Sequence, residues 1–465
     1  MRPRTSKCAP SRSASELAVP DLSSSASRSL SPEEVAEPIR DAELDALFAS
    51  LASFPNVILA VSGGADSVAM MHLVAHWAQL HAPHVKLLVA TVDHGLRAES
   101  RNEAEWVARE ARALGLQHET LVWPDAKPAT GIQDAAREAR YRLLSDLARR
   151  FPAPVAIVTA HTEDDQAETL LMRLARGSGL DGLTAMAEQR AIAEGCVLLR
   201  PLLGVSGARL RTTLRTAQRT WVEDPSNDAE RFERVRIRKA RALLASLGLS
   251  NDKIALSARR LERARAALDA GVNALKQAAR LDLHGGAFAS FAQAVWLAAP
   301  EELRLRLLGG LIASYGGQAE PLRLVQLEAL ADRMASQDFE GATLAGAIVS
   351  RHGDDVRILR EPGREALRAV TLQPGSSAVW DGRFRVSAAA DASGPVEVRA
   401  LGTQAFADLR QQLDMPRGFP AQAAATLPAF WRAAELITVP AFAALPGVSP
   451  AWGTAMRLYS AEFLG

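Results

Sequence analysis

The chain has 465 residues, a formal net charge of +1 and two cysteines. This length suggests about three domains, and the small net charge excludes a globally basic nucleic-acid-binding protein, so any RNA contact must come from local patches. Two cysteines exclude a disulfide framework and a four-cysteine metal site, and they fit a reducing compartment. No apolar run approaches the roughly 18–20 residues of a membrane span, so we expect no membrane contact and a cytoplasmic location.

The first residues predict no folded structure. Residues 1–32 are rich in serine and arginine and lack the apolar stretch of a secretory signal. We expect residues 1–40 to form a disordered extension, with a transit peptide as the alternative. A helix is expected from Ser31 or Asp41 to about Ser53.

The most informative stretch begins with an apolar, β-branched run over residues 57–61, which predicts a buried strand. The sequence SGGADS follows at residues 62–67 and leads directly into a helical pattern. Adjacent glycines let backbone N–H groups approach an anion, and a helix N-terminus directs its free N–H groups at the same point. Ser62 and Ser67 add hydroxyl donors, and the Asp66 carboxylate could hold Mg²⁺ against phosphate oxygens. The stretch predicts a pyrophosphate site, and an ordinary glycine-rich turn is the alternative.

Strands and helices then alternate. Strands are expected over residues 85–92, 118–123 and 155–160, and helices over 100–114, 131–150 and 164–176. This alternation predicts an α/β fold with a doubly wound parallel sheet, whose ligands bind beyond the carboxyl ends of the strands. Three polar clusters begin at such ends, so we expect them to converge: residues 62–67, 93–97 and 161–168.

Two clusters follow helical spacing. Arg137 shares a face with Arg140 and Tyr141, a pattern that alone is typical of a solvated helix face. Asp165 and Glu168 lie three residues apart near a predicted helix N-terminus. Spacing leaves two interpretations of these acids open, which are helix capping and a Mg²⁺ or ammonium site.

The second half of the chain begins after a turn at residues 221–228. A basic stripe follows at spacings of three and four, which suits a phosphate backbone but is also typical of a solvated helix face: Arg231, Arg234, Arg238 and Arg241. Helices are expected over residues 251–282, 301–315 and 321–335, and a hairpin over 343–349 and 355–359. After a linker at 360–363, strands are expected over 369–372, 378–386 and 396–401, and a helix over 404–413. Four aromatic residues there are expected in the core: Phe406, Phe419, Phe430 and Trp431.

The SGGADS loop resembles that of the PP-loop ATP-pyrophosphatase superfamily and lacks the spacing and the lysine of an ATPase P-loop. Further motifs narrow the resemblance to the tRNA(Ile)-lysidine synthetase family, over about residues 56–240: HGLR (94–97), AR-x2-RY (136–141), HTEDDQAET (161–169), RGSGLDGL (176–183), RPLL (200–203) and WVEDPSND (221–228). One departure is that Phe232 and Val235 stand where the family often has Tyr and Asn. This puts any specific hydrogen bond from those two positions in doubt.

The resemblance implies an adenine nucleotide alpha hydrolase-like fold with three parts. These are a PP-loop catalytic domain over residues 41–228, a mostly helical tRNA-binding domain over 229–362, and a small α+β domain over 363–465. It also implies ATP-dependent ligation of L-lysine to C2 of the wobble cytidine of tRNA(Ile) with a CAU anticodon. The cytidine is first adenylated with release of pyrophosphate, and the lysidine product changes codon reading from AUG to AUA. Whether the chain forms a homodimer is left open.

The resemblance also implies roles for individual residues. ATP would contact Ser62, Gly63, Gly64, Ala65, Asp66 and Ser67, and Mg²⁺ would be held by Asp66 and Asp165. Catalysis would involve Asp66, Arg137, His161 and Asp165, with Arg137 and Arg140 near the α-phosphate or adenylate. Lysine or tRNA would contact Glu168, Arg140, Arg234 and Arg238. Asp164 is a further candidate for the lysine or metal site.

Three rival functions are weighed against this one. A PP-loop tRNA thiolase generally needs paired cysteines, whereas Cys196 stands alone and Cys8 lies in the N-terminal extension. An amidotransferase or amide-forming ligase is disfavoured because a glutaminase would need a nucleophilic cysteine. An RNA-binding protein with an inactive nucleotide fold would have lost Asp66 or the loop glycines, which are intact.

Overall fold

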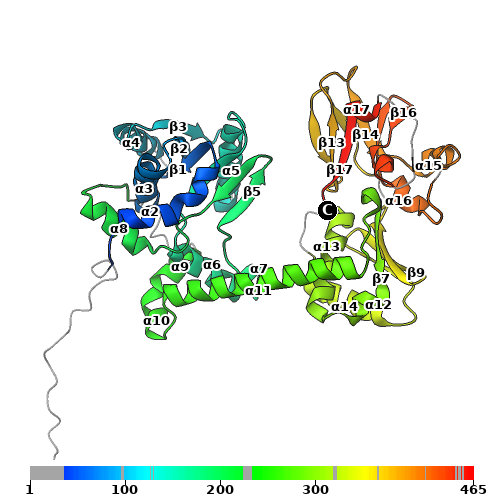
Figure 1. Cartoon of the computed structure of the whole chain (residues 1–465), viewed down its shortest axis with the longest axis horizontal. Helices are drawn as coiled ribbons and strands as arrows, with labels where there is room; N and C mark the ends of the chain where they lie inside the picture. The colour runs from blue at the N-terminus through cyan, green and yellow to red at the C-terminus, as the bar shows by residue number, and fades with distance from the viewer. Residues whose placement is uncertain are drawn as a thin grey trace, which may run out of the picture. The chain divides into compact units, whose positions relative to one another are not determined.

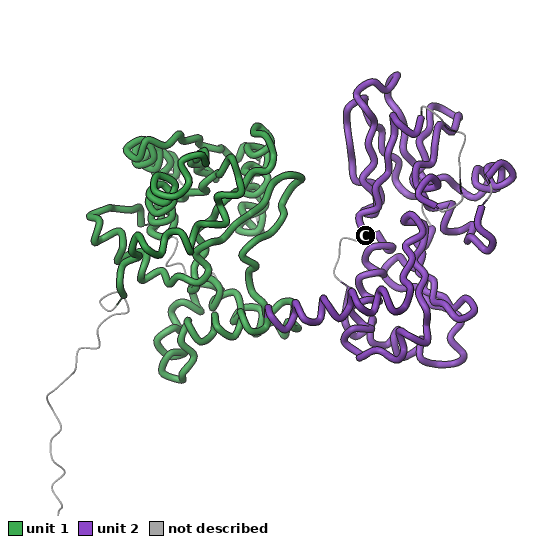
Figure 2. Tube along the Cα trace, in the orientation of Figure 1, with its two compact units in different colours: residues 1–261 green, residues 262–465 purple. Residues whose placement is uncertain are grey.

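The computed structural model describes residues 36–95, 99–125, 127–128, 130–223, 233–317, 322–363, 366–413, 415–445, 448, 452 and 455–465. The chain divides into two compact units, residues 1–261 and 262–465 (Figure 2). The domain boundaries expected at residues 228 and 362 stay predictions. Several expectations lie outside the described residues: the extension up to residue 35 with Cys8, Leu96 and Arg97 of the HGLR motif, the turn at 224–228, Arg231 and Phe232.

Unit 1 is built on a six-stranded sheet with the order β3-β2-β1-β4-β6-β5 (Figure 1). Five strands are parallel, and β5 joins the edge antiparallel to β6. The predicted doubly wound parallel sheet is confirmed, whereas the β5–β6 hairpin was not predicted. The strands are β1 (Asn56–Ala60), β2 (Lys86–Asp93), β3 (Gln117–Val122), β4 (Val155–Thr159), β5 (Gln189–Ala193) and β6 (Cys196–Leu199).

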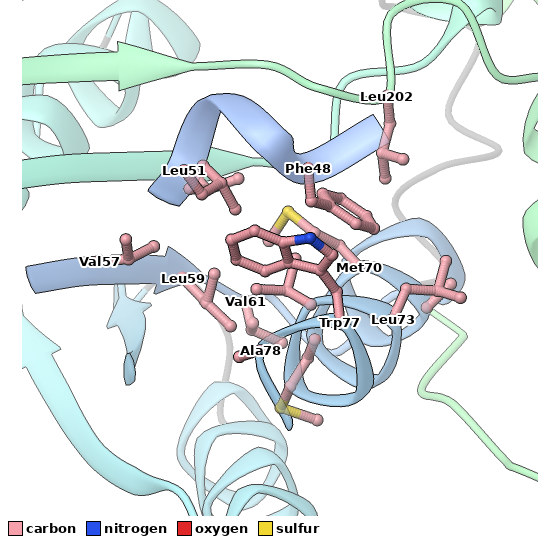
Figure 3. Packing of buried hydrophobic residues seen from close by; sticks show 14 of the residues in the cluster. Phe48, Leu51, Val57, Leu59, Val61, Met70, Leu73, Trp77, Ala78 and Leu202 are labelled. Atoms are coloured by element: carbon pink, nitrogen blue, oxygen red, sulfur yellow. The ribbon is translucent and has the colours of Figure 1, made fainter. Parts of the chain in front are cut away.

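Helices cover both faces of this sheet. The side chains of β1 alternate between the two cores that lie on these faces. Val57 and Leu59 pack in a cluster with Trp77 of α3 (Figure 3), and Ile58 packs in another cluster with Leu144 of α5. A strand buried on both faces reads as a continuous apolar run, which is why the sequence predicts it well. The helices that begin in unit 1 are α2 (Asp41–Phe48), α3 (Ala65–His81), α4 (Ser100–Ala113), α5 (Ile132–Ala148), α6 (Glu163–Ala175), α7 (Leu180–Leu183), α8 (Gly207–Thr216), α9 (Glu233–Lys239), α10 (Arg241–Ser246) and α11 (Asn251–Ala278), with the 3-10 turn η1 (Ala49–Ser53), and α11 continues past residue 261 into unit 2.

Unit 2 has two cores. The first combines the sheet β7-β10-β9-β8 with helices that include α13 and α14, and the second lies among the remaining strands. The four aromatic residues expected in the core are buried in the second cluster. The elements are β7 (Phe288–Ala292), α12 (Gln293–Ala298), α13 (Glu301–Gly316), α14 (Leu324–Ala335), β8 (Gly341–Leu344), β9 (Ala347–His352), β10 (Asp355–Arg360), β11 (Val370–Leu372), β12 (Ser377–Trp380), β13 (Phe384–Ala388), β14 (Val396–Ala400), α15 (Thr403–Arg410), α16 (Ala421–Ala425), β15 (Pro428–Arg432), β16 (Glu435–Thr438), α17 (Ala455–Leu458) and β17 (Tyr459–Phe463), with the turns η3 (His284–Gly286) and η4 (Pro440–Ala444).

Two stretches expected as single strands are hairpins instead. Between β8 and β9, Ala345 and Gly346 have φ values of +49° and +77°. Between β12 and β13, Asp381 and Gly382 have φ values of +52° and +65°. Positive φ at these positions lets the chain reverse in a short loop, of two residues between β8 and β9 and of three between β12 and β13, so each expected strand becomes two antiparallel ones. Within the described residues, no helix is both long and apolar enough to cross a membrane.

Candidate active site

The loop between β1 and α3 is held in one shape by its own groups. The Ser67 hydroxyl donates to the Gly64 carbonyl at 2.9 Å and accepts from the Ser62 backbone N–H at 3.2 Å. Gly63 has a φ of +93°, which favours glycine, and its carbonyl accepts from the Val222 backbone N–H at 2.9 Å. These hydrogen bonds therefore hold the loop backbone in one conformation before a ligand binds.

Gly64 leaves open space at the start of α3. Its φ of −70° suits any residue, and a Cβ added there would meet only the Ser62 hydroxyl, at 3.9 Å. No side chain in the described part of the chain caps the N-terminus of the 17-residue helix α3, so its first N–H groups are available to an anion. The open backbone fits a pyrophosphate group, as the sequence predicts.

Two carboxylates meet over Gly207 at the start of α8. A Cβ added to that glycine would lie 3.3 Å from Asp66 Oδ1 and 2.9 Å from Asp164 Oδ2. Burial, followed by the charge of Asp165, raises the pKa of Asp66 from 3.8 to about 6. Asp66 Oδ1 is buried and has no hydrogen-bond partner among the described residues. An unpaired carboxylate oxygen beside like charges fits a divalent cation.

The two acids at the start of α6 already have partners within the protein. Asp165 Oδ2 caps the helix, because it accepts from the Thr162 backbone N–H at 2.9 Å and from the Thr162 hydroxyl at 3.1 Å. Asp164 Oδ1 forms an ion pair with Arg241 and accepts a hydrogen bond from the Asn251 amide, each at 2.6 Å. Although burial acts in the opposite direction, these contacts lower the pKa of Asp164. Helix capping is thus observed, and a metal role for Asp165 stays a prediction.

His161 lies at the end of β4 beside several arginines. Its Nδ1 lies 2.9 Å from the Thr159 hydroxyl. Burial lowers the pKa of His161 to about 4; Asp165 opposes this shift, and Arg200, Arg137 and Arg234 add to it. His161 is therefore neutral at pH 7, and the surrounding guanidinium groups favour an anionic ligand.

Arg200, of the RPLL motif, is 3% exposed. It donates to the Ala187 carbonyl at 2.6 Å. Burial lowers its pKa, whereas a hydrogen bond with Tyr141 raises it. The motif therefore places a buried positive charge beside His161, a role that the sequence did not predict.

Two of the predicted substrate residues bind each other. Arg238 of α9 donates to both carboxylate oxygens of Glu168 in α6, at 3.0 and 3.3 Å. Glu168 is only 2% exposed, whereas the Arg238 side chain is 45% exposed. Since Arg241 pairs with Asp164, the basic stripe in part joins α9 and α10 to the acidic start of α6.

Comparison with known proteins identifies this arrangement. Residues 37–243 match the family model of the PP-loop domain. The chain is 39% identical over 414 residues to the tRNA(Ile)-lysidine synthase of Ruegeria pomeroyi, across 87% of this chain and 92% of that protein. It is 44% identical over 347 residues to the tRNA(Ile)-lysidine synthase of Bradyrhizobium diazoefficiens, across 70% of this chain and 96% of the relative. The chain belongs to the tRNA(Ile)-lysidine synthase family.

Among solved structures, this chain is similar to the U34-tRNA thiolase NcsA from Methanococcus maripaludis. The TM-score is 0.41 and the identity 15%, over 48% of this chain and 79% of the other. At this level the similarity carries no functional conclusion. Cys196, the one cysteine in the described residues, is buried, and burial raises the pKa of its thiol. This environment is opposite to that of an activated thiolate.

For a lysidine synthase, the predicted site residues fall near one end of the sheet. The charge of Asp165, in the first turn of α6, acts both on Asp66 in the loop after β1 and on His161 after β4, so these three segments lie near one another. Ala65 is the first residue of α3. Their roles toward ATP, Mg²⁺, lysine and tRNA stay predictions.

Three contacts of the site escaped sequence analysis, because each joins segments far apart in the chain. They are Asp164 with Arg241 and Asn251, Glu168 with Arg238, and His94 with Arg140. The sequence did signal His94, which begins the HGLR motif at the end of a predicted strand, but it assigned that residue no role.

Proposed function

We propose that this chain is an ATP-dependent ligase that joins the ε-amine of L-lysine to C2 of the wobble cytidine of tRNA(Ile) with a CAU anticodon. The product, lysidine, changes the codon read from AUG to AUA. The observation that carries this proposal is the open, uncapped backbone at Gly64 beside the unpaired carboxylate of Asp66, in a chain of the lysidine synthase family.

In the first step, cytosine O2 attacks the α-phosphorus of ATP and pyrophosphate leaves. The N–H groups at the start of α3 and the Ser62 hydroxyl hold the departing pyrophosphate, while the Ser67 hydroxyl, which donates to the Gly64 carbonyl, holds the loop in place. Arg137 and Arg140 bind the α-phosphate and then the adenylate, because the charge of Arg137 acts on His161 and the charges of Arg137 and Arg234 act on Arg140.

Asp66 and Asp165 would hold Mg²⁺ during this step. When bound, the cation neutralises charge that develops on the leaving pyrophosphate. No group of three His, Cys, Asp or Glu side chains in the described residues could hold a metal alone. The remaining ligands would therefore be phosphate oxygens and water, as is usual for Mg²⁺.

In the second step, the lysine ε-amine attacks C2 of the activated cytosine and AMP leaves. Asp165 attracts the ammonium group of lysine, whereas the Glu168 carboxylate is already paired with Arg238. The amine must lose a proton to attack. A pKa of about 4 makes His161 a poor base at neutral pH, so we assign His161 to hydrogen bonding with the substrate and not to proton transfer.

Release of pyrophosphate from ATP in the presence of the CAU-anticodon tRNA tests the ATP site. Gly64→Ala should fold normally, since φ and space allow alanine, yet its methyl group would fill the anion site and lower the rate at least tenfold. Asp66→Ala should abolish release. Gly310→Ala is the control, because a Cβ at Gly310 meets nothing within 4 Å and this glycine lies in α13, outside the site. Normal release from both Gly64→Ala and Asp66→Ala would reject the assigned site.

A further inference from the structure

Arg140 lies among like charges. Burial lowers the pKa of its guanidinium, and the charges of Arg137 and Arg234 act in the same direction. In the described parts of the chain, no carboxylate lies within ion-pair distance of Arg140. Its one hydrogen-bond contact there is with His94 at the end of β2, where the Arg140 NH2 group lies 3.4 Å from Nε2.

The chemistry of this contact fixes the state of the histidine. A guanidinium group has only donors, so Nε2 must accept and the imidazole must be neutral. Burial, followed by the charge of Arg140, lowers the pKa of His94 to about 4, which agrees with a neutral ring at pH 7. The proton therefore resides on Nδ1, which is buried and unpaired in the described structure.

Two strand ends hold the His94 ring in place. The preceding carboxylate, Asp93, accepts from the Gly95 backbone N–H at 2.8 Å and from the Ser100 hydroxyl at 2.7 Å. The ring itself meets Trp123, beyond the end of β3, at a centroid distance of 6.0 Å and an angle of 88°. The Trp123 backbone N–H donates to the Asp93 carbonyl at 3.0 Å, which ties the two strand ends together. His94 is thus built into the fold as a fixed acceptor.

We propose that His94 is a positioning residue that holds the Arg140 guanidinium at the anion site without cancelling its charge. A carboxylate at position 94 would also hold the guanidinium, but it would neutralise the charge that a phosphate is meant to meet. A neutral acceptor orients Arg140 and leaves its full positive charge available. The inference rests on the proposed function, which assigns Arg140 to the α-phosphate or adenylate.

Three substitutions of His94 separate orientation from charge. His94→Gln supplies a neutral acceptor, His94→Phe keeps a ring against Trp123 without an acceptor, and His94→Glu supplies a charged acceptor. The measurement is kcat and KM for ATP in tRNA-dependent pyrophosphate release at pH 7.5, with circular dichroism and melting temperature as fold controls. We expect Gln to stay within threefold of the parent chain in kcat/KM for ATP. Phe and Glu should each lower it at least tenfold.

The double variant His94→Phe with Arg140→Ala tests whether His94 acts through Arg140. We expect the pair to be no slower than Arg140→Ala alone, because the guanidinium that His94 positions is then absent. The inference would be overturned if the loss in kcat/KM of the double variant equalled the product of the two single losses. It would also be overturned by a His94→Phe variant as active as the parent chain, or by equal activity of His94→Gln and His94→Glu. If His94→Phe does not fold, the comparison of kcat/KM between His94→Gln and His94→Glu still tests the inference. Absence of pyrophosphate release from the parent chain would instead reject the proposed function.

Discussion

At the scale of single residues, two nearby aspartates have pKa values shifted in opposite directions, although burial acts to raise both. Asp66 has no partner for its buried Oδ1, and its pKa rises to about 6. Asp164 meets Arg241, Asn251 and the Gly207 backbone N–H, and its pKa is lowered. The charges of Arg211 and Arg238 offset the burial of Asp66 only in part, and a buried carboxylate whose pKa stays raised is a candidate ligand position.

Asp66→Asn should therefore stabilise the free protein at pH 8. The folded pKa of Asp66 exceeds its ordinary value of 3.8, so stability is lost as pH rises from about 4 to 6 and the full cost remains above 6. Two pKa units correspond to at most about 3 kcal/mol, a gain that should vanish toward pH 4. The measurement is the urea-unfolding midpoint at pH 8 and pH 5.

Asp164→Asn is the matched control with the opposite sign. Because the pKa of Asp164 is lowered in the folded state, its ionised carboxylate stabilises the fold above the unfolded pKa. This stabilisation is lost as pH falls through the folded pKa. The amide should therefore lower the unfolding midpoint at pH 8. A destabilised Asp66→Asn at pH 8 would contradict the account of Asp66.

At the scale of elements, the sequence predicts best where burial on both faces leaves a clear pattern. β1, β2, β3 and β4 and the helices between them begin and end within a few residues of expectation. The β5–β6 hairpin was missed because β5 has exposed residues such as Arg190 and no apolar run. The Asp381-Gly382 turn was missed although Asp-Gly is a strong hairpin signal.

The sequence predicted which residues form the site but not which of them contact one another. Loop residues such as Gly64 and Asp66 follow a local motif, so their neighbourhood could be read from the sequence. The pairing of Glu168 with Arg238 joins residues 70 positions apart. Helical spacing on α9 shows which side chains share a face but cannot show what that face meets.

The contact between α6 and α9 separates two roles within the basic stripe. Arg238→Ala would leave the buried Glu168 carboxylate unpaired and should lower the free energy of unfolding by about 2 kcal/mol, a value reduced because Arg238 is partly exposed.

Arg234→Ala should change the free energy of unfolding by no more than about 0.5 kcal/mol. It should weaken tRNA binding and lower the slope of log K against log salt by about 1, since one phosphate contact is lost. A salt titration with an unchanged slope would make Arg234 part of a solvated face.

At the scale of the whole molecule, the two units have separate cores, and unit 2 contains its own buried ionic centre. Asp381 accepts from Arg360 at 2.9 and 3.0 Å and from Arg383 at 2.7 Å. Arg383 has a fully buried side chain. Asp381→Ala would leave both guanidinium groups without their carboxylate and should lower the stability of unit 2 by about 3–5 kcal/mol.

Segment-resolved hydrogen exchange tests whether loss of stability in unit 2 leaves unit 1 unchanged. In Asp381→Ala, we expect faster exchange in β10, β12 and β13 and unchanged exchange in β1 and α3. Protection of α3 by ATP should persist, because the loop after β1 belongs to unit 1. Loss of that protection would show that the two units do not behave independently.

The central claim is that the loop after β1 positions ATP so that a tRNA cytidine can be activated for attack by lysine. The most direct measurement incubates the protein with ATP, Mg²⁺, radiolabelled lysine and either tRNA(Ile) with a CAU anticodon or the initiator tRNA, then digests the RNA to nucleosides. We predict ATP-dependent label in one modified nucleoside from the wobble position of tRNA(Ile), and no label with Asp66→Ala. Label in neither tRNA would contradict the account.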